Sequence, residues 1–458
     1  MINVSILLNR VFRLEQNPLL QSVTENIDAY NNIYIVLLEE NLTDASSIKR
    51  DYYIGTLHRF IKELQQHGVI PYVMPHDAFK SFCQNKQITN VVMAPDIMSY
   101  HRPEYDAPTL NLELGKHNIE VHFIKTNHYL TPSQTLKADG SPYRVFTPFY
   151  RKNRQLLKHK IIPKYNIKDL ADKISPSSED YVLGKLDTGS DARLAQHHWQ
   201  EFLDFYIEDY NVNREYLSEI RTSQLSIALA YGLLDIRQIM NDLLVRYNDN
   251  ETEYEGFIRE LMFREFYYVL MTQFPESATT SFKEKYRDMT WSDNEDHFRR
   301  WKAGQTGYPI IDAAMNELKE TGFMHNRTRM VVSQFLTKDL FIDWRLGEDY
   351  FRKALIDYDN ASNVHGWQWS ASTGSDAVPY FRVFNPVRQS ERFLGDGAYV
   401  RQYLPVLKHV PVKYLHAPIK HEDILKNNYN ITLGIDYPYF IVDHKTQRDH
   451  MVNQFEKF

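Results

Sequence analysis

The spacing of the apolar residues changes once along the chain, and this change limits the possible folds more than any other feature. Up to about residue 130, short apolar runs alternate with stretches of helical spacing. The runs typical of buried strands are residues 4–8, 33–38, 70–74, 91–94 and 121–124, and the helical stretches between some of them are 51–66 and 107–117. This alternation predicts an α/β domain over residues 1–130, built of βαβ units around a Rossmann-like parallel sheet.

The rest of the chain differs from this first region. Residues 131–195 are rich in Lys, Ser and Asp and contain the prolines Pro132, Pro142, Pro148, Pro163 and Pro176. Such a composition is typical of a connection that runs over a protein surface. From residue 196 onward the apolar spacing is helical almost throughout, with helices expected over 255–274, 310–320 and 328–344. The sequence therefore predicts an inter-domain linker over 131–195 and a larger all-α domain over 196–458.

Composition excludes several classes of protein. The chain has 458 residues, a mean hydropathy of -0.50 and no long uninterrupted apolar run, so we expect no membrane span. Its start, MINVSILLNR, lacks the basic lead-in of a signal peptide. Cys83 is the only cysteine, which excludes an intrachain disulfide and a Cys-based metal site. We expect a cytoplasmic protein without a metal.

The charge is unevenly distributed. A formal net charge of -6 disfavours a nucleic-acid partner, although the distribution of charge matters more than its sum. Between residues 371 and 420, seven basic residues stand against three acidic ones, a local net charge of +4. A surplus of this size also arises by chance in acidic proteins, so both a solvated basic face and a DNA-contacting surface stay open.

Candidate chemistry lies in the helical half, because no metal signature, nucleophile elbow or phosphate-binding glycine loop is present. Glu260 and Arg264 are four residues apart and share a helix face, as a surface ion pair also does. Asn326, Arg329 and Met330 share another face. The stretch DYDNASN, residues 357–363, is dense in Asx residues and is also typical of an Asx-turn loop.

Three long motifs in this half of the chain resemble a known family. They are WKAGQTGYPIIDAAMNELKETGFMHNRTRM (301–330), LTKDLFIDWRLGEDYF (336–351) and DYDNASNVHGWQWSASTGSDAVPYFRVFNP (357–386). They look like the flavin-binding domain of the photolyase/cryptochrome family, and the match runs from about residue 210 to residue 411. The resemblance implies an α/β antenna-type domain followed by a helical domain that binds FAD in a folded, U-shaped form.

The resemblance also implies which residues contact the flavin. The matching positions are Tyr210, Thr222, Ser223, Gln224, Leu225, Ser226, Phe257, Arg264, Arg329, Asp357, Asp359 and Asn363. Residues 222–226 match a helix start that holds the FAD phosphates, as hydroxyls and free N–H groups at such a start suit an anion. Arg329 and Asp357 are expected to pair near the flavin N5 edge, and Asn363 to hydrogen-bond N5 itself. Trp367, Trp344 and Trp291 match an electron relay from the protein surface to the flavin.

A second set of positions matches the pocket for damaged DNA. Glu260, Phe263, Asn326, Met330 and Trp369 match residues that line the cavity for a flipped-out pyrimidine dimer, and Arg214, Arg327 and Arg382 match DNA-contacting positions. Flipping is cheapest for a poorly paired and stacked lesion. The implied reaction is light-driven electron donation from reduced FAD to the dimer, splitting of the cyclobutane ring and return of the electron. Glu260, if protonated, and Asn326 are expected to stabilise the radical anion by hydrogen bonds, in the manner of an oxyanion hole.

The subtype follows from the same resemblance. The sequence Met324-His325-Asn326-Arg327 is similar to that of class I cyclobutane pyrimidine dimer photolyases, and differs from the paired-histidine motif of the other photoproduct-repairing class. The expected enzyme is a deoxyribodipyrimidine photo-lyase, a carbon–carbon lyase that acts on dimer-containing DNA as a monomer. A cryptochrome-like blue-light photosensor without repair activity is the alternative, and a dark FAD oxidoreductase is a third interpretation.

The sequence departs from the family pattern at several positions. Phe263 stands where a Trp usually stacks on the dimer, and Gln224 stands where an Arg often faces the FAD phosphates. Val364 and His365 replace a common Asn-Gly pair. Residues 8–17 follow the family's opening motif only loosely, and the usual antenna contacts around residues 100–106 are not recognisable. The resemblance implies a second, antenna chromophore of folate or deazaflavin type, and these departures leave its identity open.

Overall fold

A parallel sheet of five strands forms the N-terminal part of the computed structural model, which describes residues 2–95, 107–178, 181, 183–184, 188–218, 221–247 and 251–458. The strands are β1 (Ile2–Leu7), β2 (Tyr30–Glu39), β3 (Tyr72–Pro75), β4 (Ile88–Met93) and β5 (Glu120–Phe123). Their order is β3-β2-β1-β4-β5, and every pair is parallel. The predicted strands and the predicted parallel sheet are confirmed.

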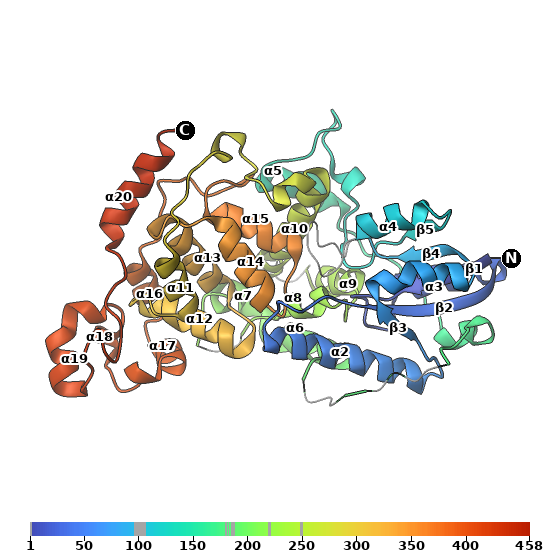
Figure 1. Ribbon diagram of the computed structural model, residues 1–458, viewed down its shortest axis with the longest axis horizontal. Helices are drawn as coiled ribbons and strands as arrows, with labels where there is room; N and C mark the ends of the chain where they lie inside the picture. The colour runs from blue at the N-terminus through green and yellow to red at the C-terminus, as the bar shows by residue number, and fades with distance from the viewer. Residues whose placement is uncertain are drawn as a thin grey trace.

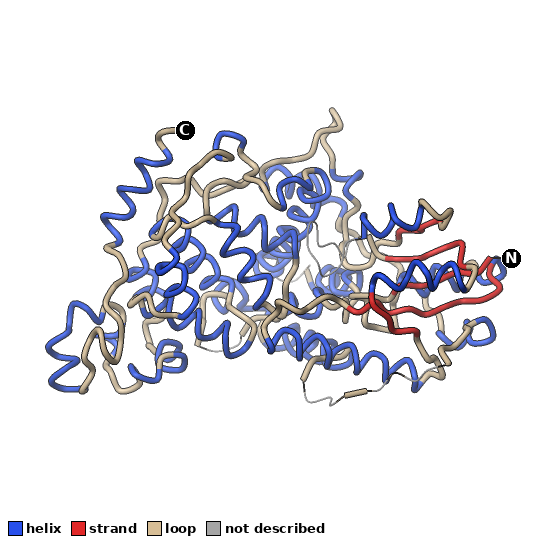
Figure 2. The backbone as a smooth tube through the Cα atoms, viewed as in Figure 1, coloured by secondary structure: helices blue, strands red, loops and turns tan. Residues whose placement is uncertain are grey.

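The centre of the sheet is buried, as a doubly covered parallel sheet requires. In β1, Ile6 pairs with Ile35 of β2 and with Val92 of β4, and these side chains are at most 1% exposed. The helices of this part are α1 (Pro18–Glu25), α2 (Ser47–Gln66), α3 (Phe79–Asn85) and α4 (Ala107–Gly115). Figures 1 and 2 show the strands near the N-terminus with helices on both sides of them.

The remainder of the chain is helical, as predicted. Its α-helices are α5 (Phe146–Asn153), α6 (Ala192–Phe205), α7 (Tyr210–Asn213), α8 (Leu225–Ala230), α9 (Ile236–Arg246), α10 (Glu251–Gln273), α11 (Glu295–Ala303), α12 (Pro309–Thr321), α13 (Asn326–Gln334), α14 (Trp344–Ala354), α15 (Asn360–Ser370), α16 (Pro386–Phe393), α17 (Ala398–Tyr403), α18 (Val412–Leu415), α19 (Glu422–Tyr429) and α20 (His444–Phe455). Figure 1 shows α10, α13, α14 and α15 grouped in the middle, with α18, α19 and α20 at the end opposite the sheet.

The sheet and the helical part share a hydrophobic core. One cluster of buried residues extends from Val4 in β1 to Leu270 in α10. Polar contacts also link the two parts. Lys49 of α2 donates through Nζ to the carbonyl oxygen of Arg352 in α14 at 2.5 Å. The Arg352 guanidinium in turn binds the Asp44 carboxylate at 2.5 Å. The helices around the site are thus fixed against the α/β part.

Three local expectations differ from the structure. The helix expected over 328–344 ends at Gln334 and continues as a π-helical turn, Phe335–Asp339. A left-handed Phe341 (φ 53°) then breaks the chain direction before Asp343 caps α14. The apolar residues Trp199, Phe202, Leu203 and Tyr210 have the spacing of a single helix face, but α6 ends at Phe205 and Tyr210 begins α7. The segment 131–195 is more than a surface connection, because it contains α5, in which Phe149 is fully buried.

No helix within the described residues is both long and apolar enough to cross a membrane.

Candidate functional site

A cavity of about 560 Å³ opens in the helical part of the molecule, a size typical of ligand pockets (about 300–1,000 Å³). Its lining comes mainly from α7, from residues 222–230, and from α10, α13 and α15. The predicted site residues among the lining are Tyr210, Arg214, Thr222, Ser223, Gln224, Leu225, Ser226, Phe257, Glu260, Phe263, Arg264, Asn326, Arg329, Met330, Asp357, Asp359, Asn363, Trp367 and Trp369. Folding thus brings the expected flavin and lesion residues into one space.

Helix α10 presents one stripe of side chains to this cavity. Phe257, Glu260, Arg264 and Tyr267 follow each other at three- and four-residue intervals, the spacing of a helix face. Glu260 and Arg264 do not pair with each other. Glu260 accepts from Arg214 at 2.9 Å, while Arg264 lies 3.8 Å from Asp359. The interpretation of Glu260 and Arg264 as a simple surface ion pair is therefore wrong.

A buried ion pair joins α13 to the segment before α15. Arg329 Nη2 donates to Asp357 Oδ2 at 2.8 Å and to Oδ1 at 3.0 Å, which confirms the predicted pairing. The Asp357 side chain is 1% exposed and the Arg329 side chain 27% exposed. His325 caps α13 by accepting from the Arg327 amide at 3.1 Å. Burial and the charges of Arg329 and Arg327 lower the pKa of His325 to about 4, so its ring is neutral at pH 7.

Asp359 fixes the start of α15. Its Oδ1 accepts from the Ser362 amide at 2.8 Å, which makes it the N-cap. Burial alone disfavours its charge, but the Arg264 guanidinium, with His128 and the Ser362 amide, outweighs that effect and lowers the pKa of the Asp359 carboxyl. Asp359 therefore stays ionised at neutral pH and can orient Arg264 at the cavity wall.

Asn363 lies one turn further along α15. Its amide nitrogen donates to Glu348 of α14, to the carboxylate at 2.9 Å and to the main-chain oxygen at 3.1 Å. Its Oδ1 atom is left as a hydrogen-bond acceptor at the cavity. Asn363, which is predicted to hydrogen-bond the flavin N5, thus has its amide nitrogen held by Glu348.

A hydroxyl-rich turn precedes α8. Gln224 has a left-handed backbone (φ 47°), and Ser223 accepts from the Leu225 amide at 3.2 Å. Thr222 and Ser226 line the same part of the cavity. These hydroxyls, together with the amides at the start of α8, form a donor set that suits an anion.

Aromatic rings form another wall of the cavity. Phe263 of α10 lines it, and the Phe146 ring of α5 stacks against Phe263 with centroids 3.4 Å apart and planes 11° from parallel. Trp369, Asn326 and Met330 line the cavity as well. The predicted lesion residues therefore include flat apolar rings and polar groups, the combination that binds a stacked base.

Four predicted residues lie outside the lining. Trp344 is fully buried and Trp291 is partly exposed. Arg327 binds Glu215 at 2.8 Å and lies over the Phe393 ring. Arg382 is exposed, and its carbonyl oxygen accepts from Lys338 at 3.1 Å.

Comparison with known proteins identifies the family. Residues 257–457 match the family described as the FAD binding domain of DNA photolyase, and residues 4–166 match the family described as DNA photolyase. A deoxyribodipyrimidine photo-lyase of Alkalihalophilus pseudofirmus is 35% identical over 463 residues, which cover 98% of this chain and 96% of that protein. The chain belongs to the DNA photolyase family.

Solved photolyases share the fold over the whole length. A bacterial class III photolyase from Agrobacterium tumefaciens superposes with a TM-score of 0.86 at 28% identity, covering 100% of this chain and 98% of that one. An archaeal photolyase from Sulfolobus tokodaii, solved with two FAD molecules, superposes with a TM-score of 0.76 at 25% identity, covering 100% of both chains. The α/β-then-helical fold is therefore that of a photolyase.

The cavity of this photolyase domain fits a flavin cofactor. A Cβ atom added at Gly366 would meet nothing of the protein within 4 Å, although Gly366 lines the cavity. The absent side chain thus leaves room beside α15 for a planar group. Hydroxyls at 222–226, two guanidinium groups and the Asn363 oxygen supply the anion-binding and ring-edge contacts that FAD requires.

The three predicted relay tryptophans lie at different depths in this photolyase structure. Trp367 lines the cavity and packs on α14 at Gly347, where a Cβ atom would come within 2.2 Å of the indole. Trp344 lies one turn before Gly347 on the same helix face. Trp291 is next to Ser292, which bridges to Ile342. Trp344 is fully buried and Trp291 is partly exposed, and an electron path through the three rings stays a prediction.

Sequence reasoning missed several residues of this photolyase site. Phe146 and Tyr267 support or line the aromatic wall, and Glu348 orients Asn363. The i+4 spacing of Tyr267 from Phe263 was a signal for one of them. Phe146 lies in the segment expected to be a linker, and no local pattern indicated that it packs beside α10. Residues 100–106, where the usual antenna contacts were not recognisable, fall outside the described residues.

Proposed function

We propose that this protein is a light-driven deoxyribodipyrimidine photo-lyase that splits cyclobutane pyrimidine dimers in DNA, with FAD as its cofactor. One observation supports this above all: residues expected to bind the flavin and residues expected to bind the lesion line the same cavity. An enzyme that passes an electron between two groups needs them next to each other, and a shared cavity provides this proximity.

The chain's own residues can hold the cofactor in a defined orientation. When bound, reduced FAD supplies an electron under blue or near-ultraviolet light. Thr222, Ser223 and Ser226 are suited to its phosphates, and the Arg329–Asp357 pair closes the opposite side of the cavity. Asn363 accepts a hydrogen bond through Oδ1 while Glu348 holds its amide nitrogen.

The other side of the cavity is suited to a flipped-out dimer. Trp369 and Phe263 offer ring faces for stacking, and Asn326 and Glu260 offer hydrogen-bonding groups. Because Glu260 already accepts from Arg214, we assign to Arg214 a role in orienting this carboxyl group. Met330 fills the remaining apolar surface beside them.

The remaining assignments concern electrons, DNA and assembly. We assign the return of the flavin to its reduced form to Trp367, Trp344 and Trp291, because Trp367 lines the cavity and Trp291 is partly exposed. Arg327 and Arg382 are assigned to the DNA backbone near the cavity.

A monomer that acts in the cytoplasm completes the proposal, and the fully buried thiol of Cys83 is compatible with a reducing compartment. An antenna chromophore is part of the proposal without a chemical identity.

A repair assay on a defined substrate tests the proposal. An oligonucleotide with one thymine dimer is incubated with purified, chemically reduced protein in light and in darkness, and intact thymines are measured by chromatography. We expect dimer loss in the light alone. Light-driven flavin reduction without any dimer loss would instead support the cryptochrome-like alternative.

A further inference from the structure

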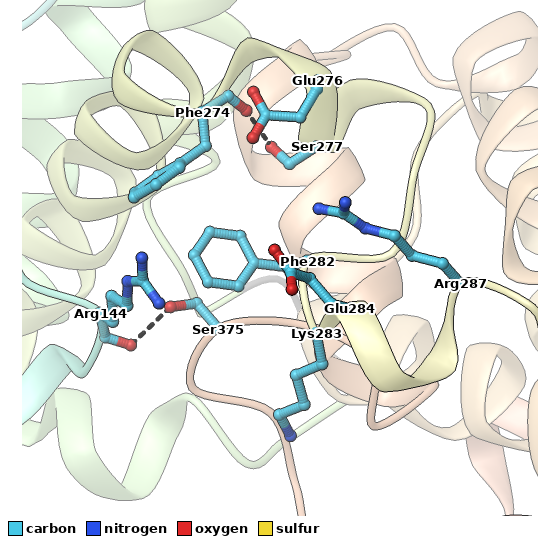
Figure 3. Close-up of a pocket in the computed structure, with 9 residues that line it drawn as sticks. All are labelled: Arg144, Phe274, Glu276, Ser277, Phe282, Lys283, Glu284, Arg287 and Ser375. Atoms are coloured by element: carbon cyan, nitrogen blue, oxygen red, sulfur yellow. Dashed lines mark hydrogen bonds between the residues drawn. The ribbon is translucent and has the colours of Figure 1, made fainter. Parts of the chain in front are cut away.

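A second pocket, of about 430 Å³, lies beside the end of α10. Phe274 and Phe282 form one part of it with ring centroids 5.0 Å apart, and both rings are half-buried. Figure 3 shows the guanidinium groups of Arg144 and Arg287 directed toward the space near these rings, with Glu276 across from them. The pocket therefore combines apolar ring surface with three cations, Arg144, Lys283 and Arg287, and with the carboxylates of Glu276 and Glu284.

Both guanidinium groups keep donors available. Arg144 lies over the rings of Phe274 and Phe282, at 5.2 and 5.7 Å from their centroids, and its side chain forms no ion pair with any described carboxylate. Arg287 donates through Nε to the Ser281 carbonyl oxygen at 3.1 Å, and it too forms no ion pair in the described part of the chain. The nearby rings hold Arg144 in place while its N–H groups face the pocket. Such an arrangement is suited to a phosphate.

Helix α10 and the residue after it contribute side chains to both the pocket and the large cavity. Phe263 and Tyr267 line the cavity, and Phe274 follows eleven residues after Phe263, on the same side of the helix. The Phe274 amide still donates to the Leu270 carbonyl oxygen at 2.8 Å, so the helical rise extends to Phe274. Eleven residues correspond to about 16 Å along a helix axis, or roughly five steps of one B-form DNA strand at 3.4 Å per step.

A second chain of contacts joins the two sites. Ser375 of the pocket donates to the Arg144 carbonyl oxygen at 2.6 Å, and the adjoining Asp376 accepts from the Phe146 amide at 2.9 Å. Phe146 is the ring that stacks behind Phe263. Gln368, between the two tryptophans of α15, accepts from the Phe282 amide at 2.8 Å. The pocket is therefore fixed in position relative to the cavity.

We propose that this pocket binds one nucleotide of the DNA strand that carries the lesion, about five nucleotides from the dimer. Its phosphate lies between Arg144 and Arg287, and its sugar and base lie on Phe274 and Phe282. Sites that bind single-stranded nucleic acid usually combine basic side chains with aromatic rings on which the bases stack. This inference rests on the proposed function, since it takes the large cavity to hold the dimer. The contact anchors the flanking strand and thereby fixes the register of the lesion over the cavity.

The test compares single strands with short and long flanks. FAD-loaded protein is titrated with oligothymidylates that carry a central dimer and either two or eight nucleotides on each side. We expect Arg144→Gln and Arg287→Gln each to weaken binding of the long strand at least about threefold, and to lower its salt slope by about 0.7, the value for one phosphate contact. Binding and repair of the short strand stay unchanged, because it does not reach the pocket.

Two controls make each outcome decisive. Arg193→Gln removes an exposed charge of the same kind on α6 and leaves binding of both strands unchanged. An undamaged strand of the long length reports on the pocket without lesion recognition, and it shows the same threefold loss. Equal losses on short and long strands, or no loss on either, overturn the proposal. If the wild-type protein splits no dimer while the undamaged strand still responds, the proposed function fails and the nucleotide site stands.

Discussion

Some residues at the cavity both stabilise the fold and form part of the site. The Asp357 carboxylate is 1% exposed and binds Arg329 through both oxygens. We predict that Asp357→Ala purifies with little FAD, because removal of one partner leaves a charge uncompensated and costs about 3–5 kcal/mol for a buried pair. The ratio of flavin to protein absorbance after gel filtration measures the effect.

The control for this prediction removes a surface carboxylate. Asp296→Ala breaks an exposed pair with Arg299 on α11, and exposed pairs are worth less than about 1 kcal/mol. It should keep its FAD. Full retention of FAD and an unchanged flavin spectrum in Asp357→Ala would show that this pair does not support the cofactor.

Phe146 yields a second prediction at the residue scale. Its ring supports Phe263 from behind, and an aromatic pair contributes about 0.5–1.5 kcal/mol beyond its burial. Phe146→Leu should therefore weaken binding of a dimer-containing strand about two- to tenfold, while the flavin spectrum stays unchanged. Phe149→Leu alters a fully buried ring of the same helix that packs on Phe266 instead. An equal loss of dimer affinity in both variants would assign the effect to α5 as a whole.

Residues of the candidate site could be predicted from the sequence where they belong to one contiguous motif. Asp357, Asp359 and Asn363 stand within seven residues, so their types and spacing were visible in the sequence, and all three line the cavity. Partners from distant segments were not visible. Glu348 is on another helix from Asn363, and nothing in its local pattern indicates that it holds that amide.

At the scale of elements, the π-helical turn Phe335–Asp339 buries a lysine. Burial lowers the pKa of Lys338 to about 7 from 10.5, with Asp339 opposing this and Lys283 adding to it. Between these values the unfolded chain binds the proton and the folded chain does not, so this group makes stability rise as pH increases from about 7 to 10.5, and its destabilising effect is complete below pH 7. We predict that Lys338→Met reduces the slope of stability against pH between 7 and 10 by up to about 1.4 kcal/mol per unit.

Chemical denaturation at several pH values measures this slope. The hydrogen bond that Lys338 gives to the Arg382 carbonyl oxygen is also lost in this variant. That loss is the same at each pH once the amine is absent, so it shifts the curve without changing its slope. An unchanged slope in Lys338→Met would mean that the amine keeps its charge in the fold.

The same turn shows why one element was predicted incorrectly. Residues 328–344 keep a helical apolar spacing, yet α13 ends at Gln334 and α14 begins at Trp344. The break depends on the left-handed Phe341 and on packing with α20, where His444 binds Asp339 at 2.5 Å. Tertiary contacts of this kind produce no periodic pattern in the sequence. The predicted strands agree with the structure because buried strands appear in the sequence as short apolar runs.

The proposed relay residues belong to several elements of the helical part. Trp367 lies on the cavity, Trp344 is fully buried behind it and Trp291 is partly exposed. Trp367→Phe should retain FAD but lose light-driven reduction of the oxidised flavin, because the first indole of the path is absent. Absorption spectra during illumination with an external reductant follow this reaction. Normal reduction in the variant would contradict the assignment, whereas repair by chemically reduced variant should persist.

At the scale of the whole molecule, the chain resembles photolyases from end to end, and its domains share one core. The boundaries at 130 and 195 stay a prediction. Sequence reasoning found the α/β and helical parts from periodicity, and the family from contiguous motifs. It could not foresee that α5 of the expected linker packs against α10, because only the folded chain brings Phe146 to Phe263.

The central claim is that one cavity holds both the flavin and the dimer. Its most direct test is an action spectrum, in which the rate of dimer splitting by reduced protein is measured at several wavelengths of equal photon flux. We predict that the rate follows the absorption of the chromophores bound to the protein and falls to zero in darkness. A rate that is independent of this absorption, or dimer splitting that continues in the dark, would contradict the account.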